Sequence, residues 1–201
     1  MKVISVCDEL RRAEQLMRSL NHFGWENEII RADWRGFGTK VNETANYLKN
    51  NKHVKEFFFL DAYDTFALGR PEEFTLNVES LISAEINCWP DAEKAHLYPQ
   101  TGYKFKYANS GSYYMKSELF LDLWHSKAIH NGDDDQRWMT DNVLERHLNI
   151  DYEREVFQTL CGVLPNDFEI IDVRIVTDNN TRPLFVHGNG KAKMDEYYAL
   201  I

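Results

Sequence analysis

The sequence lacks an excess of basic residues and has no long hydrophobic run. Its 201 residues include 32 Asp and Glu against 23 Lys and Arg, which gives a formal net charge of −9. This balance argues against a broad electrostatic grip on nucleic acid or on an anionic membrane, although a local basic groove stays open as an alternative. No segment has the pattern of a membrane span or of a signal peptide. These absences predict a cytoplasmic protein that makes no membrane contact.

Cysteine, proline and glycine are also scarce, at three, five and ten residues. Cys7, Cys88 and Cys161 are odd in number and widely spaced, so they indicate neither a disulfide framework nor a structural zinc site. With 43% hydrophobic and 27% charged residues, the composition is not that of a collagen-like, low-complexity or disordered chain. The length suits one folded domain, and we expect that domain to span residues 1–201.

The apolar pattern alternates between strands and helices along the first part of the chain. Segments 1–6, 28–32 and 57–60 have the short apolar runs of strands. Between them, apolar residues recur at helical spacing, first in a helix that Asp8 caps and Gly24 ends, and again around Val41. This β-α-β-α-β order predicts an α/β fold with a mostly parallel central sheet flanked by helices. Further along, the sequence predicts helices at 71–81, 117–124 and 136–148, and two last strands of the same sheet at 168–173 and 184–187.

The segment Phe57–Asp64 reads Phe-Phe-Phe-Leu-Asp-Ala-Tyr-Asp and ends in two carboxylates. In open α/β sheets, ligands bind at the carboxyl ends of the strands, where Asp61 and Asp64 would lie. The two side chains could instead cap turns after the strand, as Asp commonly does. Because two carboxylates at such a place can hold a divalent cation, a third ligand elsewhere in the chain would favour a metal site.

His187 supplies such a ligand. It follows the apolar segment Leu-Phe-Val, and the nearby Gly190 lets the backbone approach a ligand closely. A lone histidine before a glycine turn is more often a hydrogen-bonded structural residue, so the two aspartates are what favour a ligand role here. With Asp61 and Asp64, His187 offers two carboxylates and one imidazole. Carboxylates suit both Mg²⁺ and Mn²⁺, and the imidazole favours Mn²⁺. Open coordination positions would accept a substrate diphosphate, and Lys193 would add positive charge.

Further polar residues adjoin other predicted elements. Asp134 and Asp135 stand at the start of helix 136–148, where acidic residues often complement the helix dipole. A cluster of like charges can also raise a pKa and supply a general base. Glu85 and Trp89 follow a predicted strand and could face the same cleft, although Trp89 could equally be a core residue. Asn109 lies in the predicted turn 108–112 and could donate to a sugar hydroxyl.

Six motifs in this order resemble the glycosyltransferase domain of the procollagen lysyl hydroxylase (PLOD) family and its viral and bacterial stand-alone relatives. The motifs are Phe-Leu-Asp-Ala-Tyr-Asp, Ser-Ala-Glu-Ile-Asn-Cys-Trp-Pro, Tyr-Pro-Gln, Ala-Asn-Ser-Gly-Ser, Asp-Asp-Asp-Gln and Val-His-Gly-Asn-Gly-Lys-Ala-Lys. The resemblance covers nearly the whole chain, from Val3 to about Tyr198. It implies the GT-A fold, a nucleotide-sugar-binding α/β fold that also fits the predicted sheet.

The resemblance implies roles for individual residues. Asp61, Asp64 and His187 match the family's manganese ligands, Tyr63 matches a tyrosine that packs on the uridine, and Lys193 falls where a lysine meets the diphosphate. The sugar and acceptor side is lined in the family by residues that match Trp89, Asn109, Asp134 and Asp135.

Three features depart from the family pattern. The first strand ends in Cys7-Asp8, where the family tends to continue into small and hydroxyl residues. Ala108 and Ser112 flank the asparagine motif in place of an apolar residue and a glycine. No hydroxylase segment follows the motifs in this sequence. We therefore expect a stand-alone transferase whose uridine pocket and sugar choice can differ from those of the family.

These observations predict a metal-dependent transferase that moves glucose or galactose from a UDP-sugar to an acceptor hydroxyl. The expected acceptor is hydroxylysine in a collagen-like peptide or a hydroxymethylated base in DNA. The catalytic candidates are Glu85, Asp134 and Asp135, and the expected donor-binding residues are Tyr63, Asp61, Gly190 and Lys193. A virus-encoded enzyme acting in the host cytoplasm would fit, and stereochemistry and oligomeric state stay open.

Two other classes of protein remain as alternatives. A non-catalytic module that binds nucleotide sugars or glycans could share the cleft, but it has no need for a metal triad beside Lys193. A nucleotidyltransferase could use the same aspartates and metal. It would be expected to carry a glycine-rich, basic loop after the first strand, where this chain has Cys7-Asp8-Glu9-Leu10.

Overall fold

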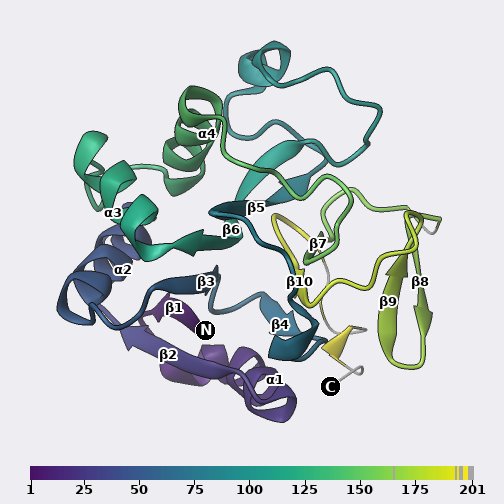
Figure 1. Ribbon diagram of the computed structural model, residues 1–201, viewed down its shortest axis with the longest axis horizontal. Helices are drawn as coiled ribbons and strands as arrows, with labels where there is room; N and C mark the ends of the chain where they lie inside the picture. The colour runs from purple at the N-terminus through teal and green to yellow at the C-terminus, as the bar shows by residue number, and fades with distance from the viewer. Residues whose placement is uncertain (165, 193, 195–196, 199–201) are drawn as a thin grey trace.

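The computed structural model describes residues 1–164, 166–192, 194 and 197–198. A five-stranded sheet forms the centre of the molecule (Figure 1), with the strand order β2-β1-β3-β6-β5. Its strands are β1 (Lys2–Cys7), β2 (Glu26–Arg31), β3 (Glu56–Leu60), β5 (Ser80–Glu85) and β6 (Tyr107–Lys116). β1 pairs in parallel with β2 and β3, whereas β6 runs antiparallel to both β3 and β5. Four strands thus share one direction and β6 opposes them, which confirms the predicted α/β class with a mixed sheet.

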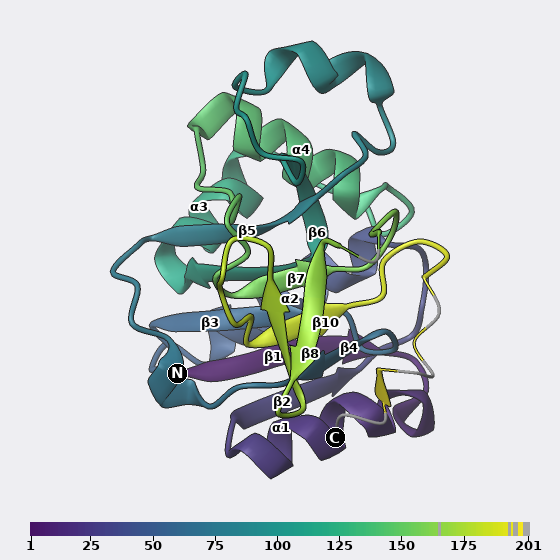
Figure 2. The same ribbon diagram turned by 90° about the vertical axis from the view of Figure 1, so that its right-hand side faces the viewer.

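Both faces of the central sheet are covered (Figures 1 and 2). One face packs against α2 (Gly38–Asn50), α3 (Ser117–Ser126) and α4 (Asp135–Arg146). The other face packs against α1 (Glu14–Phe23) and a three-stranded sheet of β4 (Thr65–Ala67), β10 (Phe185–His187) and β7 (Phe157–Thr159). Successive side chains of β3 point to opposite faces of the sheet. Phe57 and Phe59 pack on the face covered by α2, α3 and α4, and Phe58 and Leu60 pack on the other face. All four side chains are at most 2% exposed, as a continuous apolar strand predicts.

The last strands do not complete the central sheet, so that prediction is wrong. β10 pairs with β4 and β7 instead, and β8 (Phe168–Ile171) pairs with β9 (Arg174–Thr177) in a separate two-stranded hairpin at one edge of the molecule (Figure 1). Apolar alternation identifies a buried strand without identifying its partner, because pairing is decided by contacts distant in sequence.

The predicted helix 71–81 is also wrong. A 3-10 turn spans Pro71–Glu73, and the chain then runs extended into β5. Phe74, Leu76 and Val78 pack against the core at every second position, which is the spacing of an extended chain rather than of a helix. Pro71 therefore starts only a single turn.

Two turn assignments near the site need correction. Asp8 does not cap α1, because a 3-10 turn over Leu10–Ala13 precedes that helix and no side chain caps it. Gly24 does end α1 as predicted, with a φ of 80°. Residues 108–112 are not a turn but the middle of β6, where small polar residues are buried against the site.

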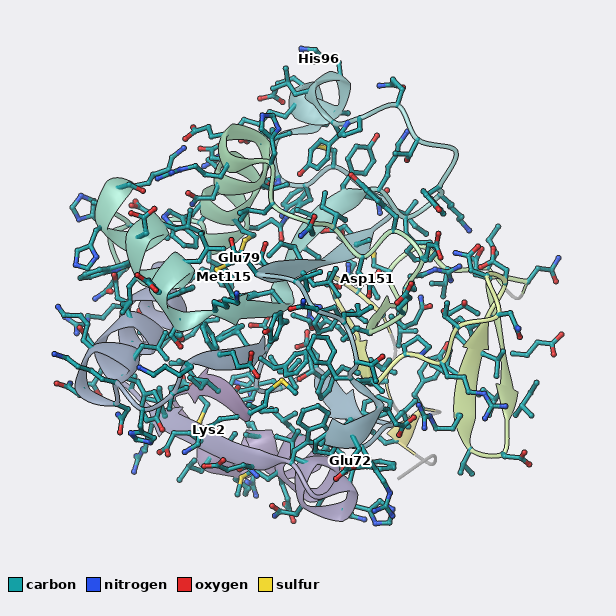
Figure 3. The ribbon with its side chains drawn as sticks, in the orientation of Figure 1. Lys2, Glu72, Glu79, His96, Met115 and Asp151 are labelled. Atoms are coloured by element: carbon teal, nitrogen blue, oxygen red, sulfur yellow. The ribbon has the colours of Figure 1, made fainter. Side chains whose placement is uncertain are left out.

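Asp151 fixes the entry to β7 (Figure 3). Its carboxylate accepts hydrogen bonds from the backbone N–H groups of Val156, at 2.9 Å, and Phe157, at 2.8 Å. Burial raises the pKa of Asp151 to about 6 despite these bonds. Among the described residues, no helix combines the length and apolar character needed to cross a bilayer.

Candidate active site

Three elements bring the predicted metal ligands together. Asp61 follows β3, Asp64 precedes β4, and His187 ends β10. His187 Nε2 lies 3.7 Å from Asp61 Oδ2 and 3.5 Å from Asp64 Oδ1, and one ligand atom from each residue lies within 4.8 Å of the others. Backbone hydrogen bonds of 2.7 Å, from Asp61 to Gly111 and from Gly188 to Asp64, hold the segments in place. Two carboxylates and one imidazole on three tied segments form a donor set for one divalent cation.

The hydrogen bonding of His187 suits a metal ligand. Its Nδ1 lies 2.9 Å from Asn109 Oδ1, and because an amide oxygen only accepts, Nδ1 donates and Nε2 presents its lone pair toward the aspartates. Burial by itself would lower the pKa of His187, but the Asp64 and Asp61 carboxylates outweigh it and raise that pKa. The acidic pair therefore attracts positive charge to this position, which a divalent cation would supply.

Gly111 leaves the room that this arrangement needs. A Cβ atom at Gly111 would lie 2.1 Å from His187 Cε1 and 2.7 Å from Asp61 Oδ2, which are distances no side chain tolerates. The backbone of β6 thus forms one wall of the triad directly. The residues fit a divalent cation both in chemistry and in space.

A first cavity of about 410 Å³ opens on one side of the triad. Its walls include Tyr63, Trp34 and Phe37, so it offers aromatic surface next to Asp61 and Asp64. A nucleoside could stack on such a surface while its phosphates face the aspartates. Tyr63, the residue predicted to meet the uridine, is therefore placed in this cavity.

A second cavity of about 650 Å³ opens on the other side of the triad. It shares Phe37, Lys40, Asp61 and Asp64 with the first, so the triad lies at the junction of the two. The remaining predicted residues that the structure describes all line this cavity: Glu85, Trp89, Asn109, Asp134, Asp135 and Gly190. Lys193 lies outside the described residues.

Glu85 is a carboxyl group of the second cavity whose pKa is clearly raised. Its two oxygens accept from Asn109 Nδ2 at 3.0 Å and from Asn189 Nδ2 at 3.1 Å. These bonds favour the charged form, but burial outweighs them and raises the pKa of Glu85 to about 7. Glu85 can therefore gain or lose a proton near neutral pH, as a general acid or base must.

The acidic run before α4 divides into residues of different kinds. Asp134 is the N-cap of α4 and accepts a hydrogen bond from the Arg137 backbone N–H at 2.9 Å. This agrees with the ordinary structural role of acidic residues at the start of a helix. Asp135 is buried and accepts from Ser110 Oγ at 3.0 Å. Trp89 is 65% exposed at the rim of the second cavity, which makes it no core residue.

Lys40 is a functional candidate that the sequence analysis missed. The residue is 6% exposed, and its Nζ lies 2.6 Å from Asp61 Oδ1 and 2.8 Å from Asp135 Oδ2. Burial would lower the pKa of Lys40, but the two carboxylates raise it overall, so the side chain is a fixed cation. A signal was present, because Lys40 shares the four-residue spacing of the buried Thr44 and Leu48 on α2, where a lysine needs a partner.

Asn189 was also missed, although it stands in a quoted motif. Its Oδ1 accepts from the backbone N–H groups of Leu160, at 3.1 Å, and Cys161, at 2.9 Å. Its Nδ2 is thereby turned toward Glu85. Asn189 joins the loop after β7 to the carboxyl group of the second cavity.

Comparison with solved structures supports the type of fold. The crystal structure of a glycosyltransferase involved in the glycosylation of the major capsid of PBCV-1 matches with a TM-score of 0.55 and 13% identity. The match covers all of this chain and 98% of that one. The fold is therefore of the GT-A type, the α/β architecture of nucleotide-sugar glycosyltransferases, as predicted.

Comparison of sequences gives the family. The model described as PLOD GT domain matches residues 6–198, and the chain belongs to this family of glycosyltransferase domains. An uncharacterized protein of Acanthamoeba polyphaga mimivirus is 32% identical over 169 residues, covering 79% of this chain and 36% of that protein. The multifunctional procollagen lysine hydroxylase and glycosyltransferase LH3 of Homo sapiens is 32% identical over 230 residues, covering 98% and 31%. The chain thus spans about a third of the length of these curated relatives.

Proposed function

We propose that this protein transfers glucose or galactose from a UDP-sugar to an acceptor hydroxyl, with Mn²⁺ as its metal and Mg²⁺ as a weaker substitute. One observation carries the proposal: the Asp61, Asp64 and His187 triad lies at the junction of an aromatic cavity and a carboxylate-lined cavity. A donor that crosses this junction would have its nucleoside in the first cavity and its sugar in the second. The bond to be broken would then lie beside the triad.

On the donor side, the chain's own residues would bind and orient the nucleotide. Tyr63 stacks on the base, and Asp61, Asp64 and His187 hold the metal. When bound, that metal stabilises the charge that develops on the departing diphosphate. Gly190, with a φ of 67°, lets the backbone come close to the phosphates, and Lys193 contributes positive charge.

On the sugar side, two carboxyl groups have different surroundings. Asp135 Oδ2 is paired with the Lys40 ammonium at 2.8 Å, and the carboxyl group can accept hydrogen bonds from sugar hydroxyls. Glu85 holds or takes a proton near neutral pH, which suits exchange with the acceptor hydroxyl. Asn109 links Glu85 to His187, Asp134 adds a further carboxylate to the lining of the cavity, and Trp89 would cover the bound sugar.

We propose a hydroxylysine-type acceptor on a peptide rather than a hydroxymethylated base in DNA. The second cavity is lined by carboxylates and the whole chain carries −9, both of which disfavour a phosphate backbone. The name of the human relative includes a procollagen lysine hydroxylase, which agrees with an acceptor of this kind. We also propose that residues 1–201 form one domain that acts in the cytoplasm, in an infected cell if the protein is viral.

Release of UDP from a panel of UDP-sugars, without an added acceptor, tests the reaction. We expect slow hydrolysis of UDP-glucose or UDP-galactose with Mn²⁺, less with Mg²⁺ and none after chelation. Asp64→Ala should abolish it, and Asp122→Ala, which removes an exposed carboxylate on α3, should not. Metal-dependent UDP binding without release from any sugar would contradict the proposal and support the non-catalytic module.

A further inference from the structure

Asp8 is a feature of the first cavity that the family resemblance does not explain. It directly follows β1, is exposed, and lines both the cavity of about 410 Å³ and a neighbouring one of about 560 Å³. A carboxylate only accepts, so it restricts which ligand atoms can face it.

Asp8 is held against the side chain of Tyr63. The Tyr63 hydroxyl accepts from the backbone N–H groups of Asp8, at 3.0 Å, and Glu9, at 3.1 Å, and it donates to Asp8 Oδ1. These three bonds use the donor and both acceptor sites of the hydroxyl. The tyrosine can therefore stack on a base but cannot select it by hydrogen bonding.

Arg12 places a donor beside this acceptor. Its guanidinium lies 3.9 Å from the centroid of the Tyr63 ring, within the range of a cation–π contact, and it lines the same cavity. Arg12 thus covers one face of the Tyr63 ring, so a base that stacks on this ring would take the opposite face. Asp8, which is bonded to the Tyr63 hydroxyl, is then the charged group that adjoins the edge of the base.

We propose that Asp8 selects the base of the nucleotide donor by accepting a hydrogen bond from the N3–H of uracil. This inference rests on the proposed function and specifies its donor site. Cytosine carries a lone pair at N3, which would face the carboxylate without a proton between them. Guanine presents two adjacent N–H groups that together need both carboxylate oxygens, and one of these already accepts from Tyr63.

Calorimetric binding of UDP, CDP, GDP and 3-methyluridine 5′-diphosphate, each with Mn²⁺, tests the proposal. We expect UDP to bind at least about tenfold more tightly than the other three, because each leaves a polar group of the site unmatched. In Asp8→Asn, the amide can donate to the N3 of cytosine while its oxygen still accepts from Tyr63. The ratio of CDP to UDP dissociation constants should therefore fall to near one.

Glu9→Gln is the matched control, since it removes one charge at the next position from an exposed side chain. It should keep the preference for UDP. An unchanged preference in Asp8→Asn, or equal binding of UDP and its 3-methyl derivative, would overturn the role of Asp8. If UDP and CDP bind the unaltered protein equally, only this inference fails. If no nucleoside diphosphate binds it, the proposed function fails as well.

Discussion

His187 is the residue whose contacts constrain the chemistry of the site most tightly. Asn109 fixes its Nδ1, two carboxylates face its Nε2, and the ring is 3% exposed. Both ring nitrogens therefore face identified polar groups. A metal role is therefore testable without any assay of turnover.

Replacing His187 by Ala should weaken Mn²⁺-dependent UDP binding at least about tenfold, because loss of one ligand leaves two carboxylates to hold the metal. Titration calorimetry with and without chelator measures this. His96→Ala is the control, since His96 is exposed at the top edge of Figure 3 and its Nδ1 lies 2.6 Å from the Glu93 carbonyl oxygen. Unchanged affinity in His187→Ala would mean that the metal lies elsewhere.

Lys40 should stabilise the fold as well as the site. Lys40→Met leaves Asp61 and Asp135 facing each other without a cation, which should lower the free energy of unfolding by about 3 kcal/mol. Adding Asp135→Asn should restore part of this loss. Urea denaturation measures both effects, with the exposed pair Lys116 and Glu79 as control, where Lys116→Met should cost less than about 1 kcal/mol. Equal costs at the two lysines would contradict the bridging role.

Glu85 should make stability fall as pH rises. Its folded pKa is about 7 against an ordinary 4.5, so between these values the unfolded chain has released a proton that the folded protein keeps. The stability that Glu85 contributes is fully present below pH 4.5 and is lost as pH rises through about 7, amounting to about 3 kcal/mol at most.

Urea titrations of the unaltered protein and Glu85→Gln at several values of pH check this. The difference between their free energies of unfolding should decline between about pH 5 and 7. Asp151, with a pKa of about 6, has the same effect in both proteins and cancels from the difference. A difference that does not vary with pH would mean that burial does not perturb Glu85.

At the scale of elements, β6 shows why the site tolerates so little variation. The strand pairs with β3 and β5, and its small residues let the ends of β3 and β10 approach. Composition alone suggested a turn at residues 108–112, since Asn, Ser and Gly are typical turn residues. Their presence in a strand is explained by the site, which needs a backbone without a side chain at Gly111.

Gly111→Ala should therefore disrupt the metal site while β6 itself persists. The added Cβ would displace His187 or Asp61, so we expect loss of Mn²⁺-dependent UDP binding with little change in the far-ultraviolet circular dichroism. Gly102→Ala serves as the control, because no heavy atom lies within 4 Å of its added Cβ. Retained binding in Gly111→Ala would show that the ligands can shift to accommodate it.

At the scale of the whole molecule, binding should be coupled to folding. The triad joins β3, β4 and β10, which belong to two sheets, so a ligand there ties separate layers together. Mn²⁺ and UDP at about 100 times their dissociation constant should add about 2.7 kcal/mol and raise Tm by several degrees. Thermal denaturation with a chelator in place of Mn²⁺ is the control, and an equal shift there would contradict metal-dependent binding.

Features carried by short segments could be predicted from the sequence alone. The four apolar residues of β3, the carboxylates that follow it, and the glycine that ends α1 depend on neighbours within a few positions. The alternation of strands and helices therefore predicted the α/β class, and the ordered motifs pointed to the family. These features could be predicted because they depend on the spacing of apolar residues and on the residue types of turns, which neighbouring positions show directly.

Contacts between residues far apart in the sequence could be found only from the folded structure. The salt bridges of Lys40 span 21 positions to Asp61 and 95 to Asp135, and the two hydrogen bonds of Glu85 reach Asn109 and Asn189. The pKa values of these groups, the pairing of β10 and the extended path after Pro71 follow from such contacts. Desolvation and charge pairing depend on the residues that surround a group in the folded protein. Those residues come from distant parts of the chain, so the order of the sequence does not reveal them.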